Sequence, residues 1–229
     1  MNAATPIVQS HAMARQERTF LVLIFAYSFV PVIGGLVRLV ELAGGPTLMP
    51  DNPRVIADPL PVVIHIVGNF AYCFIGATQF LPSLRRQNPE RHRRLGYTVV
   101  LAGLASAASG IYMTHAYAFP AGLQGELLYG FRLFIGSAML TLITWGVVAA
   151  RSGRFRDHAA AMVRAYAIAQ GASTQGFLGM TWMIATGEEA VGLTRDILMI
   201  FAWVLNLAVA ELIIRRGVYQ ARPHPSGDR

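Results

Sequence analysis

Long segments of this chain carry few or no charged side chains, and that feature constrains its fold more than any other. The first segment, residues 20–37, contains no charge at all. A helix of about 20 apolar residues is long enough to cross the hydrocarbon core of a bilayer. Later segments of the same character are residues 60–84, 95–125 with a short loop around Pro120, 127–150, 160–185 and 197–214. The sequence therefore predicts about six transmembrane helices.

The composition agrees with a membrane location. Of the 229 residues, 54% are hydrophobic and only 14% are charged, whereas about 25% of residues are charged in a typical soluble domain. Inside a bilayer every backbone N–H and C=O group needs a partner within the protein, so a spanning segment is either a helix or a strand of a closed barrel. The sequence lacks the alternating pattern of barrel strands. We therefore expect an all-α fold, an integral membrane helical bundle.

Polar segments flank the expected bundle. Residues 1–19 are predicted to form a polar N-terminal arm and residues 20–216 the six-helix transmembrane domain. Residues 217–229 are predicted to be a polar, disordered C-terminal tail. Several proline and aspartate residues fall within residues 44–61, which is typical of a loop.

The arginines are distributed unevenly over the expected loops. All 19 basic residues are arginine, and 15 of them fall on one side when the spans are threaded in order. Basic loops of membrane proteins face the cytoplasm, so we expect both termini on the cytoplasmic side of a bacterial inner membrane. The net charge of +7 has the same explanation. No basic helix or aromatic-interleaved basic patch indicates a nucleic-acid partner, and the lipid bilayer is the partner that the sequence predicts.

Polar and small residues recur along the segment 60–84 at steps of three or four. This spacing places them on one face of a helix: His65, Gly68, Asn69, Tyr72, Gly76 and Gln79. Polar groups at membrane depth usually face the protein interior or a wet cavity, so the face is a candidate wall of a binding pocket. The alternative is helix–helix packing, in which small residues permit close approach and amides bond across helices.

Four histidines lie near the ends of expected spans. His65 and His115 are expected at one depth, near the outer boundary, and His92 and His158 at another, near the inner one. Two facing pairs of imidazoles on neighbouring helices suit b-type haem, so haem b is a cofactor hypothesis for these four residues. The alternative is that they lie among lipid headgroups or in solvent.

Charged residues approach the inner ends of the expected spans. Glu211 is placed to meet Arg164 or Arg93, and such ion pairing is an economical way to hold charge near lipid. The same two arginines, together with the inner histidines, are suited to binding an anionic headgroup or ligand.

Two motifs resemble those of a known family. The first is His65-x2-Gly68…Gly76-x2-Gln79-Phe80…Arg85…Pro89-x2-His92-Arg93-x2-Gly96-Tyr97, the second is Arg154…His158-x3-Met162-x-Arg164-x-Tyr166-Ala167, and Asn206…Glu211 follows in the last helix. Over about residues 60–215 the chain resembles an uncharacterised family of bacterial multi-pass membrane proteins, a domain of unknown function of the DUF2306 type.

The resemblance implies a membrane fold of six to seven helices and no particular activity. The residues that it marks as candidates are His65, His92, Arg93, His158, Arg164 and Glu211. The family usually has an aromatic residue between His158 and Met162, where this chain has Ala161. That departure weakens a stacking role at this position.

These observations favour a membrane protein whose polar core binds a small ligand or lipid, and nothing in the sequence shows it to be an enzyme. The candidate ligand-binding residues are His65, Asn69, Gln79, His92, Arg93, His158, Arg164 and Glu211. Two alternatives stay open: a b-type haem or quinone-linked redox protein that uses the paired histidines, and an accessory subunit with a partner in a larger membrane complex. The sequence contains no P-loop, HExxH motif or serine nucleophile elbow.

Overall fold

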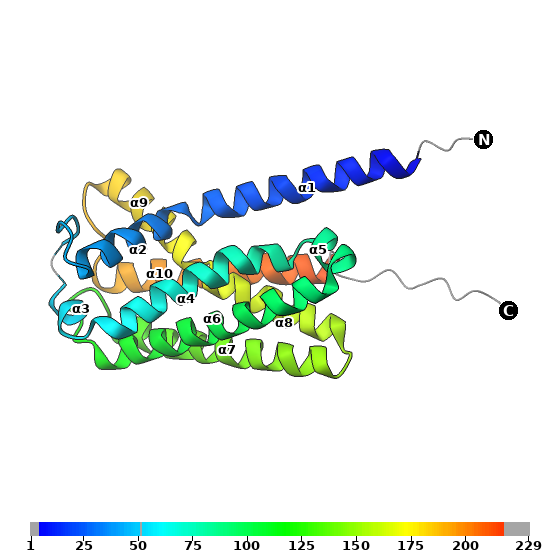
Figure 1. Cartoon of the computed structure of the whole chain (residues 1–229). Helices are drawn as coiled ribbons and strands as arrows, with labels where there is room; N and C mark the ends of the chain where they lie inside the picture. Colours follow the sequence, from blue (N-terminus) through cyan, green and yellow to red (C-terminus); the bar gives the residue numbers. More distant parts are fainter. Residues whose placement is uncertain (1–4, 51, 218–229) are drawn as a thin grey trace.

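The computed structural model describes residues 5–50 and 52–217, and every regular element in that part of the chain is a helix. The expected all-α membrane bundle is confirmed. The long helices lie roughly along one axis (Figure 1). The elements are α1 (Thr5–Tyr27), α2 (Phe29–Leu42), α3 (Pro53–Ala57), α4 (Pro59–Gln79), α5 (Pro82–Gln87), α6 (Pro89–Ala116), α7 (Glu126–Arg151), α8 (Phe155–Ala169), α9 (Gly171–Thr186) and α10 (Gly192–Arg215).

Of the two polar segments predicted to flank the bundle, the structure describes most of the first and only one residue of the second. From Thr5 the predicted N-terminal arm is helical and continues into the first apolar segment as α1. Residues 1–4 lie outside the described residues, and so does the predicted C-terminal tail apart from Gly217.

Four helices are long and apolar enough to cross a membrane, namely α4, α6, α7 and α10. The pair Arg15–Tyr27 and Phe29–Leu42 makes a fifth if it is counted as one span, with a bend of 53° between the two helices. The expected span at residues 160–185 is divided at Gln170 into α8 and α9, which have 15 and 16 residues. The structure thus supports four or five spans. Six stays a prediction that requires α8 and α9 to cross the bilayer as a unit.

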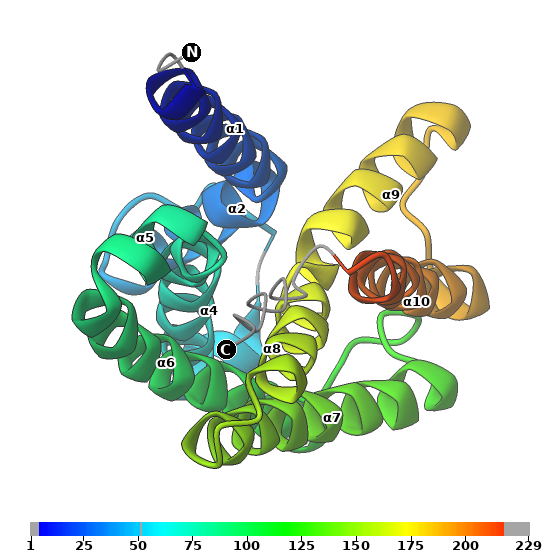
Figure 2. The ribbon, with the colours of Figure 1, turned by 90° about the vertical axis from the view of Figure 1, so that its right-hand side faces the viewer.

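The bundle is held together by contacts between consecutive long helices. Helix α4 packs on α6, α6 on α7 and α7 on α8, while α10 lies against α8 and α9, and Figure 2 shows this order from the end of the bundle. Tyr72 of α4 is 1% exposed. A Cβ atom at Gly103 of α6 would lie only 2.5 Å from the Tyr72 ring. A glycine is therefore needed where α4 and α6 approach each other.

The two helix breaks are joined to each other. Ser28, between α1 and α2, is 3% exposed, and Gln170, between α8 and α9, is 4% exposed. The Nε2 atom of Gln170 donates to the Ser28 hydroxyl at 3.1 Å and to the Tyr166 hydroxyl at 3.0 Å. Polar groups within a membrane protein need internal partners, and here one break supplies a partner for the other.

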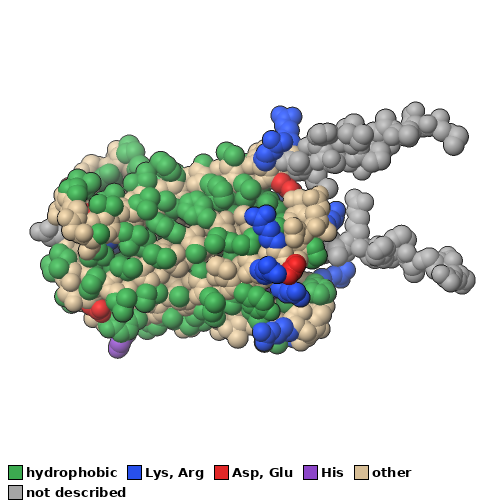
Figure 3. Space-filling model, in the orientation of Figure 1, with side chains coloured by type: hydrophobic (Ala, Val, Ile, Leu, Met, Phe, Trp, Pro, Cys, Tyr) green, Lys and Arg blue, Asp and Glu red, His purple; other side chains and the backbone are tan. Residues whose placement is uncertain are grey.

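The surface divides into an apolar body and an arginine-rich end. On the face shown in Figure 3, hydrophobic side chains cover most of the bundle and the basic side chains gather at one end. That end holds α5, the start of α6 and the turn between α7 and α8 (Figure 1), and we call it the arginine-rich end. The opposite end, where α3 lies, is called the α3 end. The arginines of the arginine-rich end are Arg85, Arg86, Arg91, Arg93, Arg94, Arg151, Arg154 and Arg156.

Candidate functional site

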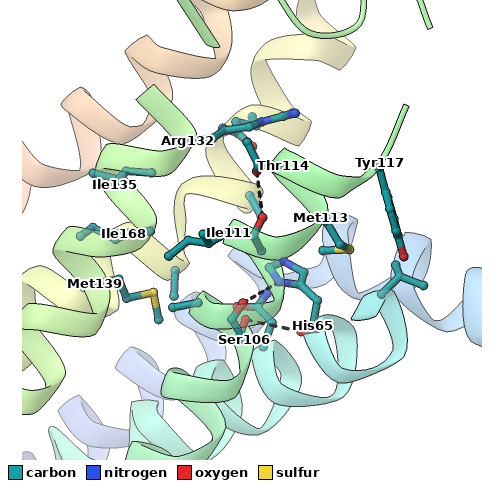
Figure 4. Close-up of a pocket in the computed structure, with 18 of the residues that line it drawn as sticks. His65, Ser106, Ile111, Met113, Thr114, Tyr117, Arg132, Ile135, Met139 and Ile168 are labelled. Carbon is teal, nitrogen blue, oxygen red and sulfur yellow. Dashed lines mark hydrogen bonds between the residues drawn. The ribbon is translucent and has the colours of Figure 1, made fainter. Parts of the chain in front are cut away.

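A cavity of about 350 Å³ lies between α4, α6 and α7, and residues of α8, α9 and α10 complete its wall. It extends to the α3 end, where Arg54 and Phe119 belong to its lining. Figure 4 shows His65 and Ser106 on one side of this cavity. The apolar side chains Ile135, Met139 and Ile168 lie on the other side (Figure 4). The cavity is therefore polar on part of its wall and apolar on the rest.

His65 is held in the cavity wall by helix α6. Its Nδ1 atom lies 2.8 Å from the backbone carbonyl oxygen of Ser106. A Cβ atom at position 110 would lie 3.2 Å from the imidazole Cε1 atom, so Gly110 leaves room for the ring. Because a carbonyl oxygen only accepts, Nδ1 is the donor in this contact, and Nε2 is an acceptor when the ring is neutral.

Two tyrosines fix the segment that borders the α3 end of the cavity. The Tyr117 hydroxyl, just beyond α6, donates to the backbone carbonyl of Asp58 at 2.5 Å. The Tyr112 hydroxyl donates to the Asp58 carboxylate at 3.1 Å. Asp58 joins α3 to α4, so these bonds hold the short helix α3, and with it Arg54, against the end of α6.

Two arginines meet around one aromatic ring at this end. The Cζ atom of Arg54 lies 4.1 Å from the centre of the Phe119 ring, and that of Arg132 lies 5.1 Å from it. Arg132 also donates to the Oε1 atom of Gln124 at 2.5 Å. Burial lowers the pKa of Arg54, and the positive charges of Arg195 and Arg38 lower it further. Cation–π contact stabilises both guanidinium groups. It does not satisfy the hydrogen-bonding capacity of their N–H groups, which need acceptors of their own.

The polar face of α4 divides between the two predicted roles. His65 and Asn69 line the cavity, as expected for a pocket wall. Gly76 packs on α8 instead, because a Cβ atom there would lie 3.2 Å from the Tyr166 ring. Gln79 lies at the far end of α4, and its Nε2 atom is 3.5 Å from the Thr78 hydroxyl. Only the first part of the face is therefore available to a ligand in the cavity.

The other five candidates lie at or near the arginine-rich end, and none of them lines the cavity. Arg164 forms two bonds to Glu211, from Nε to Oε1 at 2.5 Å and from Nη2 to Oε2 at 3.0 Å. The expected ion pair is thus confirmed. His158 is within 2.9 Å of the Gly146 carbonyl through Nδ1. His92 has a buried Nδ1 atom without a hydrogen-bond partner in the described part of the chain, and Arg93 is exposed.

The histidines of the haem hypothesis have different surroundings. His65 lines the cavity, whereas His115 is exposed and its Nδ1 atom lies 2.9 Å from the Tyr129 hydroxyl. Of these two, only His65 lines the cavity. His92 and His158 are near each other at the arginine-rich end. Haem ligation stays a prediction.

Comparison with known protein families finds one family that matches the chain. The model of the DUF2306 family, described as a predicted membrane protein, matches residues 62–214. The chain belongs to this family. No protein of curated function and no solved structure matches the chain. In this DUF2306 protein the matched region runs from α4 to α10, so it contains most of the cavity wall, while α3 and Arg54 precede it.

The sequence did not single out Arg54, Arg132, Phe119 or Gln124 as site residues. One signal was present for Arg132, because a charge inside an otherwise apolar segment usually faces the protein interior. Arg54 lies in a proline-rich loop and gives no comparable signal. Within the described residues, no group of three or more histidine, cysteine or acidic side chains is arranged to hold a metal ion.

Proposed function

We propose that this DUF2306 protein binds a small molecule in the cavity between α4, α6 and α7. The observation that carries the proposal is the cavity itself. Its volume of about 350 Å³ falls within the range of about 300–1,000 Å³ that small-molecule sites occupy. Its wall is mainly apolar with a few polar groups, which is the usual composition of such sites.

The contact between Ser109 and His65 does not support acyl transfer. The Ser109 hydroxyl lies 3.5 Å from Nδ1 of His65, which resembles a nucleophile beside a base. However, Nδ1 donates its proton to the Ser106 carbonyl, and the Ser109 hydroxyl donates to the Ala105 carbonyl at 2.7 Å. Neither group is arranged to activate the other.

The test is to fill the cavity with a side chain. Ala172 of α9 lines the cavity, so Ala172→Phe should exclude a bound molecule. Ala185→Phe adds the same ring to the same helix at an exposed position and is the matched control. In native mass spectrometry we expect stoichiometric small-molecule adducts on the wild type and on Ala185→Phe, and their loss from Ala172→Phe. Identical adducts on all three proteins would contradict the proposal.

We also propose that both termini face the cytoplasm of a bacterial inner membrane. The gathering of arginines at the end of the bundle that contains α5 supports this orientation, because basic loops are retained on the cytoplasmic side.

The two alternative functions are open to direct measurement on the purified protein. A Soret band after haem supplementation would favour the b-type cytochrome. Stable copurification of a second membrane protein in mild detergent would favour the accessory subunit.

A further inference from the structure

Three arginines from different elements converge on the α3 end of the cavity. Arg54 comes from α3, Arg132 from α7 and Arg195 from α10. Arg54 and Arg132 line the cavity and share the Phe119 ring. Arg195 lies close enough that its charge lowers the pKa of Arg54. Like charges repel, so a bound anion would stabilise an arrangement of this kind.

Among the described residues, none of the three arginines has a salt bridge to a carboxylate. The ion pairs that the structure describes are Arg38–Glu41, Arg94–Glu90, Arg154–Asp157 and Arg164–Glu211. The Nη1 atom of Arg54 and the Nε atom of Arg195 are buried and have no hydrogen-bond partner in the same part of the chain. A buried N–H group without a partner is unfavourable.

Two carboxylates at this end, those of Asp196 and Asp58, already have other partners. Asp196 is 2% exposed, and its two oxygens accept from the backbone N–H groups of Gly125 and Leu128 at 3.1 and 3.2 Å. Those N–H groups begin α7, so Asp196 serves as the N-terminal partner of that helix. Asp58 accepts from the Tyr112 hydroxyl. Neither carboxylate forms a salt bridge with the three arginines in the described structure.

Arg132 is also held in position. Its partner Gln124 donates from Nε2 to the Thr114 carbonyl at 3.3 Å, which connects the loop before α7 back to α6. A guanidinium that is fixed in this way loses little conformational freedom when it binds an anion, and its planar donor set matches a carboxylate or phosphate.

The deeper wall has the opposite character. Ile135, Met139 and Ile168 face the cavity without charge (Figure 4), and Trp203 of α10 adds an aromatic surface. A ligand that satisfied both regions would carry a negative headgroup at the α3 end and an apolar portion beside α7 and α8.

We propose that the ligand is an amphipathic anion whose carboxylate or phosphate is bound by Arg54 and Arg132, with Arg195 adding to the positive field. This inference rests on the proposed function and specifies its ligand class. The apolar portion lies along Ile135, Met139 and Ile168. The anion supplies the acceptor that the buried Nη1 atom of Arg54 lacks within the described chain.

The test uses the full chain in a neutral detergent and the fluorescent long-chain carboxylate cis-parinarate. We expect palmitate to displace this probe, and hexadecanol, which has the same chain without the charge, to be at least about tenfold weaker because it cannot form charge-assisted bonds. Arg54→Gln and Arg132→Gln should each weaken cis-parinarate binding by about tenfold. Arg94→Gln removes one charge at the arginine-rich end and should leave binding unchanged.

Two competitors identify the source of the anion. Displacement by inorganic phosphate alone would assign recognition to a free small anion. Displacement by vesicles containing phosphatidylglycerol, but not by vesicles of neutral lipid, would assign it to a lipid headgroup. Either result supports an anionic headgroup at the arginines. If Arg132→Gln does not fold, Arg54→Gln carries the test, because Arg54 lies on the short helix α3 outside the long bundle helices.

The inference and the proposed function fail in different ways. Equal competition by palmitate and hexadecanol, with no effect of Arg54→Gln or Arg132→Gln, would overturn the anionic ligand. The proposed function would survive that result if Ala172→Phe still abolished cis-parinarate binding. If the wild type and Ala172→Phe behave alike toward every probe, the cavity is not a binding site and both proposals are wrong.

Discussion

Arg164 and Glu211 form a two-bond ion pair between α8 and α10. Their side chains are 34% and 37% exposed, so solvent screens the pair and its net contribution to stability is modest. The paired geometry is suited to joining two helices rather than to holding a ligand, since both Glu211 oxygens are already used. At the scale of single residues, the pairing of α8 with α10 therefore accounts for Arg164 and Glu211 without a ligand.

The substitution Glu211→Gln tests this structural role. Removing the charge should lower the free energy of unfolding by about 0.2–1 kcal/mol, which corresponds to a fall in melting temperature of at most about 2–4 °C. Thermal unfolding in detergent measures it. The matched control is Glu90→Gln, which breaks the more exposed Arg94–Glu90 pair and should have a smaller effect. Loss of ligand binding by Glu211→Gln at unchanged stability would contradict the assignment.

Two helices are interrupted in this bundle, and the interruptions meet. Gln170 accepts a bond from the Ser173 hydroxyl at 3.0 Å in addition to its bonds with Ser28 and Tyr166. The nearby Tyr27 and Thr174 hydroxyls are also bonded to each other, and Thr174 donates to Asn206 of α10 at 2.8 Å. At the scale of elements, this network links α1, α9 and α10 where no continuous helix does so.

Gln170→Leu should therefore destabilise the bundle more than the small change in side-chain size suggests. The change removes the buried hydrogen bonds of Gln170 to Ser28, Tyr166 and Ser173, and we expect a loss of about 1–3 kcal/mol in the free energy of unfolding. The melting temperature in detergent, compared with that of Gln87→Leu at an exposed position, is the measurement. Combining Gln170→Leu with Ser28→Ala should cost less than the sum of the two changes, because the pair shares a bond. Simple additivity would show that the two breaks are independent.

In the whole molecule, the arginine-rich end lies opposite the end to which the cavity extends. The chain contains one cysteine, Cys73, and it is buried, so introduced cysteines can be labelled almost without background. Ser152 lies in the α7–α8 turn and Ala121 in the α6–α7 loop, and both are exposed. These two positions report on opposite ends of the bundle.

We expect a membrane-impermeant maleimide to label Ala121→Cys on intact cells. In the proposed orientation the arginine-rich end faces the cytoplasm, so Ser152→Cys should react only after the inner membrane is opened. Labelling of Cys73 in the unsubstituted chain is the background control. The reverse pattern would overturn the proposed orientation and would place the cavity opening on the cytoplasmic side.

The sequence alone determined the features that depend on residues close together along the chain. Runs of apolar residues predicted an all-α membrane bundle, because a spanning segment must satisfy its own backbone. The loop arginines predicted an uneven charge distribution, which the fold shows at its arginine-rich end. Steps of three and four predicted that His65 and Asn69 face inward, and both line the cavity.

Properties that depend on distant segments were decided only by the tertiary structure. Arg54 and Arg132 are far apart in the chain and meet on Phe119 because Tyr112 and Tyr117 hold the α3 end closed over α6. No local pattern specifies that convergence. The break at Gln170 is equally hidden, since the apolar run passes through it without a proline. A cavity is the space that packed helices leave unfilled, and it depends on crossing geometry and on side chains from several elements at once.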